Sequence, residues 1–349
     1  MNLASPKPLA CALLVAAGIF LAGRSARTSL GSGELVVFHA PSTVTRKAPP
    51  LTANITGRWS GDEPLRYRVN GGDWQELVPS PPRMQKPWFA LEIDSDRLLP
   101  HAQNEVEIAA GLRAETLRFS YDPSPARLPI EIDWSKLSGR ELEAQDGIWE
   151  TLQVDGEWRV RPVPGTEDYD RLLCVTPSFS GGRRVECDIV LRRATQPDQL
   201  MGVGVLSYWA GHPDDEGVRP RRGWSFAIGW YYTLYGAVGM EFSHKAGGAP
   251  YHWVSSYRNE YMPPNVPHRL VMESWAERGA EGVAKRYRAR LKWWPRGEDE
   301  PGEWQEIVDR PGGELLESEY CVALVAHRCQ AEFGAVRVTA IDDVVVESR

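Results

Sequence analysis

Two aromatic runs of alternating residues, between positions 201 and 240, constrain the fold of this chain more than any other stretch. Alternate positions hold Val203, Val205, Ser207 and Trp209 in the first run, and Trp224, Phe226, Ile228 and Trp230 in the second. Successive side chains of a β-strand point to opposite faces of a sheet, so each set is expected to share one face. The two runs predict a hairpin within a β-sandwich.

A polar loop joins the two runs and is expected to face a ligand. Its charged and imidazole side chains are His212, Asp214, Asp215, Glu216, Arg219, Arg221 and Arg222. Binding sites combine aromatic walls with a few polar groups, often on loops that a rigid scaffold holds. The candidate ligand-binding residues are Trp209, His212, Asp214, Arg221, Trp224 and Trp230, followed by Tyr251, His252, Trp253 and Tyr257 on the next strand pair. The alternative is that most of these rings fill the core and that the acidic run is a solvated turn.

The composition favours a chain of strands and turns. It includes 27 prolines, 32 glycines and 14 tryptophans in 349 residues, and runs of helix-forming residues are scarce. Proline and glycine favour turns, so an all-β chain is expected, and its length suffices for two domains with separate cores. The net charge of −7 argues against nucleic acid as a partner, because phosphate binding needs a positive contact face.

Residues 1–30 are predicted to be a signal peptide or a membrane anchor. Lys7 precedes an apolar run that ends at Ala22, and Arg24 follows it. About fifteen apolar residues suit a secretory signal, whereas a membrane span needs roughly twenty. We therefore expect an exported protein, extracellular or in the cell envelope, which keeps a membrane tether if the segment is not cleaved. Residues 31–43 are expected to be a linker that leads to an edge strand.

A first β domain is expected over residues 44–122. Its clearest unit spans positions 65–78, where alternating apolar residues flank Asn70-Gly71. An Asn-Gly turn in such a setting is a strong hairpin signal. The hairpin YRVNGGDW and the segment DRLLPHAQNEVEIAA resemble the immunoglobulin-like domains that precede catalytic or binding modules in bacterial exported proteins.

A proline-containing linker at 123–127 is expected to separate a second domain over residues 128–349, because proline stiffens the chain and removes backbone donors. Within this domain, segments 169–179 and 182–192 are predicted to form a hairpin.

The register of that hairpin brings Cys174 opposite Cys187. A disulfide between them is favoured in an exported protein. Directly opposed strand positions strain a disulfide, however, and buried thiols are common, so both states stay open. Cys321 and Cys329 could pair only if the chain turns between them, and the disulfide connectivity is not determined by the sequence.

The order of motifs in the second domain resembles a known superfamily. These motifs are IDWSKL, DGIWETLQVDGEWRVRP, GTEDYDRLL, VGVLSYWAGH, AIGWYY and YRARLKWWPRGEDEPGEWQE, with AEFGAVRVTAIDDVVVES at the end. Together they are similar to the concanavalin A-like lectin/glucanase superfamily and, more narrowly, to bacterial LamG-like domains that follow an immunoglobulin-like module. The resemblance implies a jelly roll of two antiparallel sheets with one concave face.

Because that superfamily contains glucanases, we compared the sequence with their paired carboxylates, which lie about 5 Å apart in retaining enzymes. Glu131-Ile-Asp133 and Glu92-Ile-Asp94 begin the required pattern, but neither continues to the final glutamate. The chain also holds no HExxH, CxxC, phosphate-loop or GxSxG motif. No catalytic residue is therefore predicted, and no cofactor. Calcium at Asp214 and Asp215 is conceivable, although two adjacent carboxylates are weak evidence for it, and the metal ligands are unknown.

A row of basic residues alternates with apolar ones from Arg286 to Lys292. The basic positions are Arg286, Arg288, Arg290 and Lys292. They could hold an anionic glycan or envelope polymer, or they could form an ordinary outer face paired with acidic neighbours.

The sequence thus predicts an all-β chain in which an immunoglobulin-like sandwich precedes a concanavalin A-like, LamG-like jelly roll. The expected function is that of a non-catalytic, lectin-like module whose partner is a carbohydrate or cell-envelope polymer. The alternatives are a polysaccharide hydrolase or lyase of the same fold and a structural envelope protein.

Overall fold

The computed structural model describes residues 33–47, 51–77, 88–166, 169–194, 200–212, 223–233, 236–244, 252–309 and 319–345. The predicted targeting segment at 1–30 lies outside these ranges. The residues from Gly33 onward form one compact unit. Among the described residues, no helix is long and apolar enough to cross a membrane.

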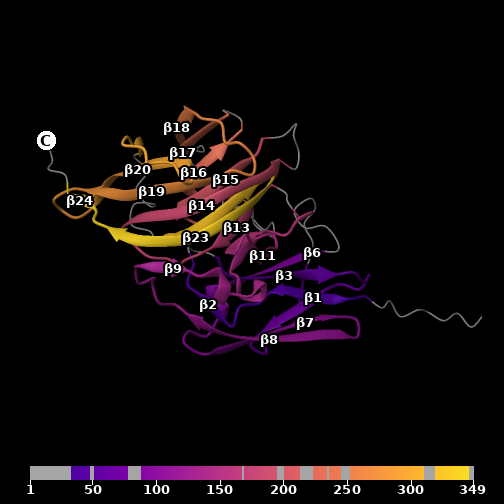
Figure 1. Cartoon of the computed structure of the whole chain (residues 1–349). Helices are drawn as coiled ribbons and strands as arrows, with labels where there is room; N and C mark the ends of the chain where they lie inside the picture. Colours follow the sequence, from indigo (N-terminus) through magenta and orange to yellow (C-terminus); the bar gives the residue numbers. More distant parts are fainter. Residues whose placement is uncertain are drawn as a thin grey trace, which may run out of the picture. The chain divides into compact units, whose positions relative to one another are not determined.

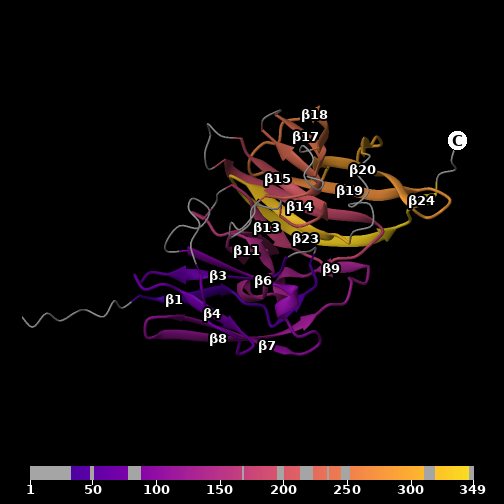
Figure 2. The ribbon, with the colours of Figure 1, turned by 180° about the vertical axis from the view of Figure 1, so that it is seen from behind.

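The chain is all-β, as the sequence predicts. Within the described residues the helical segments are single 3₁₀ turns, namely η1 (Ser95–Arg97), η2 (Trp134–Lys136) and η3 (Gly139–Glu141). All other regular structure consists of strands, which are grouped into four sheets (Figures 1 and 2).

The first two sheets enclose a core of their own. The three-stranded sheet has the order β1 (Leu35–His39), β3 (Leu51–Trp59) and β6 (Trp88–Asp94), and the five-stranded sheet has the order β2 (Thr43–Thr45), β8 (Arg113–Asp122), β7 (Gln103–Ala110), β4 (Arg66–Val69) and β5 (Gln75–Glu76). Ile93, Val106 and Ile108, each at most 1 % exposed, lie in this core. The Asn70-Gly71 turn is confirmed: both residues have positive φ (52° and 71°), which is the type I′ geometry of tight hairpins.

The other two sheets form a second, larger sandwich. The seven-stranded sheet has the order β10 (Ala144–Asp146), β13 (Arg171–Cys174), β22 (Cys321–His327), β15 (Gly202–Trp209), β16 (Phe226–Tyr232), β17 (Ala237–His244) and β18 (His252–Asn259). The nine-stranded sheet has the order β11 (Trp149–Val154), β12 (Glu157–Pro162), β23 (Cys329–Ile341), β14 (Gly182–Ala194), β19 (Pro267–Arg278), β20 (Ala284–Pro295) and β21 (Gln305–Asp309), with β9 (Ile130–Ile132) on β23 and β24 (Val344–Val345) on β19. A single apolar core, which includes Val185, Met240 and Phe333, lies between these two sheets.

The predicted hairpin of segments 169–179 and 182–192 is wrong. Strand β13 pairs with β10 and β22, whereas β14 pairs with β19 and β23 in the other sheet. The chain therefore crosses from one sheet to the other between them. Alternation of apolar and polar residues shows that a segment is a strand with one apolar face. It does not show whether two consecutive strands pair side by side in one sheet or pack face to face in two sheets.

The favoured disulfide between Cys174 and Cys187 is wrong for the same reason. Cys174 lies opposite Ala323 on the side of the seven-stranded sheet that faces away from the core, and Cys187 lies in the core between the sheets. Both are buried thiols.

A buried arginine stabilises the segment in which the chain passes from β13 to β14. The Arg183 guanidinium is fully buried and lies 3.9 Å from the Phe179 ring centre and 4.2 Å from that of Tyr208. It donates to the carbonyls of Phe179 (3.1 Å), Gly181 (2.8 Å) and Tyr320 (3.0 Å). Because buried polar groups must be hydrogen-bonded, this side chain ties the turn to the end of β22.

The two sandwiches contact each other through buried polar groups. His39, at the end of β1, donates from Nδ1 to the Gly139 carbonyl (2.7 Å) and accepts at Nε2 from the Trp149 amide (2.9 Å). Burial lowers the pKa of His39 to about 4, so the ring is neutral, as both bonds require. Lys47 Nζ, also buried, donates to Glu143 Oε2 (2.6 Å).

Candidate functional site

The aromatic hairpin predicted between residues 201 and 240 is confirmed, because β15 and β16 pair in antiparallel fashion. The prediction that alternate residues of each run share one face of the sheet is confirmed in part. Val203 and Val205 point into the core, and Ser207 Oγ bonds to Ser274 Oγ across the sandwich (2.7 Å).

Trp209 does not share that face. A register shift between Leu206 and Tyr208 turns the strand, so Tyr208 points into the core and Trp209 points to the opposite side of the sheet. On β16, Phe226 lies in the core, whereas Ile228 and Trp230 lie on the other side. A β-bulge inserts one residue and exchanges the faces beyond it, which strict alternation does not anticipate.

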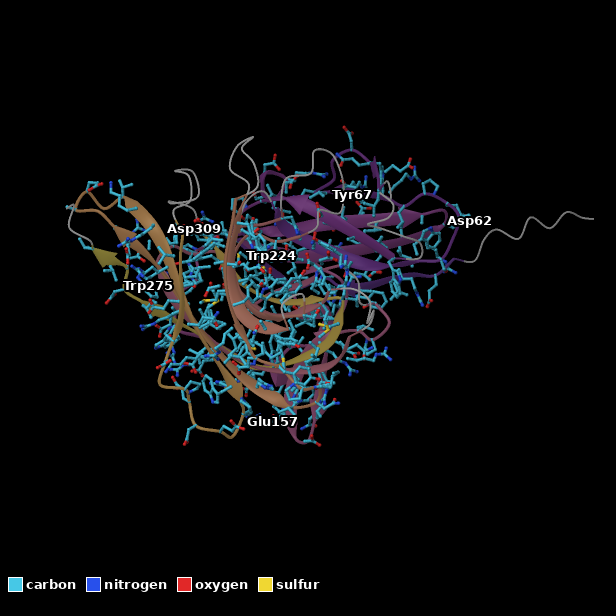
Figure 3. The ribbon with its side chains drawn as sticks, turned by 90° about the horizontal axis from the view of Figure 1, so that it is seen from above. Asp62, Tyr67, Glu157, Trp224, Trp275 and Asp309 are labelled. Carbon is cyan, nitrogen blue, oxygen red and sulfur yellow. The ribbon has the colours of Figure 1, made fainter. Side chains whose placement is uncertain are left out.

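The side of the seven-stranded sheet that faces away from the core forms the candidate site, and we call it the aromatic face. Its rings are Trp209, Trp224, Trp230, Tyr232, Trp253 and Tyr257. Figure 3 labels Trp224 on one side of the second sandwich and Trp275, which belongs to the nine-stranded sheet, on the other.

The centre of the aromatic face is Trp230, which is 4 % exposed. Its ring is stacked on Tyr232, with centroids 4.4 Å apart and planes 7° apart, and Trp224 meets it edge-on at 5.7 Å. A Cβ atom at Gly202 or Gly204 would collide with Trp230. The two glycines of β15 therefore leave the space in which the ring lies against the sheet.

A buried carboxylate adjoins this ring. Glu241, on β17, is 6 % exposed, and its Oε2 accepts from Trp253 Nε1 (2.9 Å). Its Oε1 bonds to the Tyr257 hydroxyl, which also accepts from Trp230 Nε1 (2.8 Å). Burial raises the pKa of Glu241, and these hydrogen bonds oppose the shift only in part.

A histidine and an aspartate adjoin the other edge of Trp230. His327 Nδ1 lies 2.8 Å from Asp170 Oδ1, and both residues are buried. Tyr169, 42 % exposed, meets the imidazole edge-on at 4.9 Å, and Trp230 does so at 6.4 Å. The aromatic face thus carries polar groups on both sides of its central ring.

The sequence-predicted residues divide into three groups. Trp224, which is half-buried, and Trp230, which is 4 % exposed, lie together on the aromatic face. Trp209 and His212 are beside them but buried, 0 % and 6 % exposed, with centroids 5.5 Å apart. Asp214 and Arg221 lie outside the described residues, as do Asp215, Glu216, Arg219, Arg222 and Tyr251.

Trp209 and His212 each have a hydrogen-bonding atom that no described residue engages. His212 Nδ1 donates to the Gly223 carbonyl (2.7 Å), which leaves Nε2 as an acceptor. Neither this atom nor the Trp209 indole N–H has a partner among the described residues, although both are buried. A donor and an acceptor in adjacent side chains suit one hydroxyl group.

Four residues of the site were missed by the sequence reasoning. They are Glu241, Tyr232, Asp170 and His327. For Glu241 a signal existed: Val238, Met240 and Phe242 of β17 point into the core, so Glu241 lies on the aromatic face by alternation. No comparable signal joins Asp170 to His327, since they meet only through the pairing of β13 with β22.

The other features weighed in the sequence have structural roles. Glu131 pairs with Arg337, and Asp133 caps η2 by accepting from the Ser135 amide (3.0 Å). The basic row is paired with acidic neighbours: Arg286 and Arg288 with Glu277, Arg290 with Glu273, and Lys292 with Glu300. Within the described ranges no group of three or more histidine, cysteine, aspartate or glutamate residues could hold a metal ion.

No family model and no curated protein matches this sequence. Solved structures with partial similarity include the carbohydrate recognition domain of Emp46p in its metal-free form, with a TM-score of 0.32, 10 % identity, and coverage of 55 % of this chain and 88 % of that one. The VIP36 exoplasmic/lumenal domain bound to Ca²⁺ and Man3GlcNAc has a TM-score of 0.34, 9 % identity, and coverage of 58 % and 85 %. A Bacteroides ovatus mixed-linkage glucan GH16 protein has a TM-score of 0.32, 9 % identity, and coverage of 54 % and 84 %. Likenesses at this level carry no argument about function.

Proposed function

We propose that the aromatic face binds carbohydrate without catalysing its breakdown. The observation that carries this proposal is the central Trp230, which is stacked on Tyr232 and flanked by the hydrogen-bonded carboxylate of Glu241. Sugars present C–H faces to aromatic rings and hydroxyl groups to polar atoms, and this surface offers both.

Two features give a sugar specific points of contact. Trp253 is 47 % exposed while its indole N–H is held by Glu241, so the ring face has a fixed orientation. A ring that is already ordered loses little conformational entropy when it stacks on a ligand. The unused atoms of Trp209 and His212 would accept a sugar hydroxyl that donates to one and accepts from the other.

A hydrolase is the second candidate function, because the raised pKa of Glu241 is what a general acid requires. A retaining hydrolase also needs a second carboxyl group about 5 Å away. Among the described residues, the side chains bonded to the Glu241 carboxylate are Trp253 and Tyr257, and neither is a carboxylate. Asp170 is engaged by His327. The geometry therefore favours binding over hydrolysis.

The finer parts of the sequence-based prediction are also retained as proposals. We infer that the second sandwich is a concanavalin A-like, LamG-like jelly roll over residues 128–349 and that the first is an immunoglobulin-like domain. The sequence places this first domain at 44–122, but β1 of the predicted linker also pairs into its sheet. Residues 1–30 would direct export, and a cell-envelope polysaccharide would then be an accessible partner. These assignments rest on the sequence motifs and on the two separate cores.

The test is binding of the purified chain to a broad glycan array, with and without calcium, followed by incubation with each hit and analysis for shortened products. Saturable binding without products is the expected result. Products would establish the hydrolase or lyase instead. Absence of binding to every glycan, together with co-purification of an envelope protein, would favour a structural role.

A further inference from the structure

Two cysteines lie on neighbouring strands of the seven-stranded sheet. Cys174 is the last residue of β13 and lies opposite Ala323 of β22, and Cys321 begins β22 two residues earlier. All three belong to the apolar cluster on the side of the sheet that faces away from the core. The two cysteines are therefore diagonal neighbours on one face, and Cys321 raises the pKa of the Cys174 thiol.

A buried ammonium group stands beside this pair. Lys47 is 3 % exposed, and its charge interacts with both Cys174 and Cys321 as well as with Glu143. Burial raises the pKa of Cys174 well above its usual value, and the Lys47 charge opposes this shift only in part. A neighbouring ammonium favours the thiolate, which is the form that reacts.

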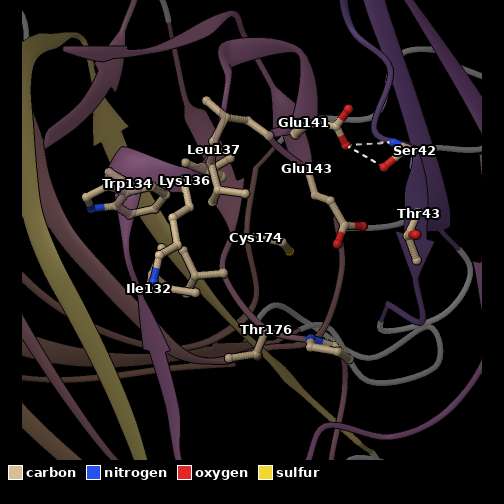
Figure 4. Close-up of a pocket in the computed structure, with 14 residues that line it drawn as sticks. Ser42, Thr43, Ile132, Trp134, Lys136, Leu137, Glu141, Glu143, Cys174 and Thr176 are labelled. Atoms are coloured by element: carbon tan, nitrogen blue, oxygen red, sulfur yellow. Dashed lines mark hydrogen bonds between the residues drawn. The ribbon is translucent and has the colours of Figure 1, made fainter. Parts of the chain in front are cut away.

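The pair is connected to a cavity. A cavity of about 450 Å³ is lined by Ser42 and Thr43 of the first sandwich and, in the second, by segments that include Glu143, Cys174 and Thr176. Figure 4 shows Cys174 at this cavity, between Glu143 and Thr176. A space of this size admits a small molecule, so a reagent has a route to the Cys174 sulfur.

We propose that Cys174 and Cys321 form a reversible dithiol/disulfide pair that a small disulfide oxidises through this cavity. The Cys174 thiolate attacks one sulfur of the reagent, forming a mixed disulfide and releasing one thiol. Cys321 then loses its proton and attacks the Cys174 sulfur, which releases the second thiol and leaves the Cys174–Cys321 bond. Two protein thiols are oxidised, and one disulfide is reduced to two thiols.

The position of the pair makes this bond a labile one. Diagonal neighbours in a sheet are farther apart than the usual partners of a disulfide, so the strands must adjust to close it. Strained disulfides are the ones that are readily reduced again. The bond would join β13 to β22 directly beside Trp209, which lies opposite Cys321 in β15. Oxidation would therefore act on the strands that support the aromatic face.

The test exposes the full chain to increasing concentrations of bis(2-hydroxyethyl) disulfide, followed by alkylation, digestion without reduction and mass spectrometry. We expect one cross-linked peptide pair, containing Cys174 and Cys321 and lighter by two hydrogen atoms, which disappears after treatment with dithiothreitol. Cys174→Ala should abolish it. Cys187→Ala is the matched control, since it removes another buried thiol of the same sandwich, and should leave the yield unchanged.

Three results would overturn the proposal: no cross-link at any concentration, a cross-link that contains another cysteine, or a mixed disulfide on Cys174 that never resolves. The peptide map of the unmodified chain distinguishes these results by itself. It decides the question even if the alanine variants fold poorly.

Discussion

The two outer surfaces of the second sandwich stabilise their buried carboxylates in different ways. On the nine-stranded sheet, four carboxylates are each held by two arginines: Glu186 by Arg184 and Arg269, Glu273 by Arg184 and Arg290, Glu277 by Arg286 and Arg288, and Glu332 by Arg159 and Arg192. On the aromatic face, Glu241 is held by Trp253 and Tyr257, and no arginine of the described part of the chain bonds to it.

The difference distinguishes a surface whose charges are paired from the surface that we propose to bind carbohydrate. Charges that share partners in a network satisfy one another, so the nine-stranded sheet leaves little for a ligand to neutralise. The aromatic face instead keeps the unused atoms of Trp209 and His212 and a half-exposed ring at Trp253. Hydrogen-bonding capacity and exposed ring faces are what a sugar would contact.

The largest expected effect is that of Trp209→Ala on stability. This ring is fully buried, and its removal leaves a cavity beneath the aromatic face, which should lower the free energy of unfolding by about 3–5 kcal/mol. Urea unfolding of the variant measures it, with Trp209→Phe as a milder control. An unchanged midpoint would mean that the ring is not part of the packed sheet.

Removal of a carboxylate from the nine-stranded sheet should lower the free energy of unfolding nearly as much. Glu332→Ala removes the buried carboxylate that Arg159 contacts at 3.0 Å and leaves this buried guanidinium only its 3.3 Å bond to Glu157, so we expect a loss of about 3 kcal/mol in the free energy of unfolding. Glu306→Ala is the matched control, because this exposed carboxylate makes only a 3.8 Å contact to Arg288. If glycan binding is found, folded Glu332→Ala protein should bind with unchanged affinity. Weakened binding would remove the distinction between the two surfaces.

Trp253→Ala should affect binding and not folding. The ring is half exposed, so its loss should weaken the affinity for a glycan hit by about 1–3 kcal/mol while the unfolding midpoint stays nearly constant. Titration calorimetry measures the affinity. Trp158→Ala is the control, because it removes a ring of similar exposure (41 %) from the nine-stranded sheet. Equal effects of the two substitutions would show that the sugar does not distinguish the surfaces.

The smallest expected effect is a difference in how Glu241 and Glu332 change the free energy of unfolding with pH. The pKa of Glu241 is raised, so between 4.5 and its folded-state value the native state binds more protons and stability falls as pH rises. The pKa of Glu332 is lowered, so its contribution is present above 4.5 and is lost as pH falls through the folded-state value.

Two glutamine variants test this contrast. Relative to the unmodified chain, Glu241→Gln should gain stability as pH rises above 4.5, whereas the deficit of Glu332→Gln should shrink below it. Thermal unfolding across a pH series measures both. Parallel curves for the two variants would contradict the assignment of opposite environments.

Local patterns accounted for much of the fold. Alternation predicted β15, β16 and the basic strand β20, and Asn70-Gly71 predicted its turn, because each depends on neighbours in the sequence. The position of Trp209 was mispredicted, since a bulge depends on how β15 fits between β16 and β22. The pairing of β13 with β22 joins segments about 150 residues apart, and no local pattern specifies that partner.

By itself, the sequence determined that this chain is built of strands, where several of them lie and which of their side chains are apolar. Those properties follow from backbone preferences and from the two-residue period of a strand. Only the tertiary structure decided that β13 and β14 belong to different sheets, that Glu241 and Tyr257 meet beside Trp230, and that Cys174 lies near Cys321. These contacts depend on which strands pair, and pairing is selected by the packing of the whole sandwich.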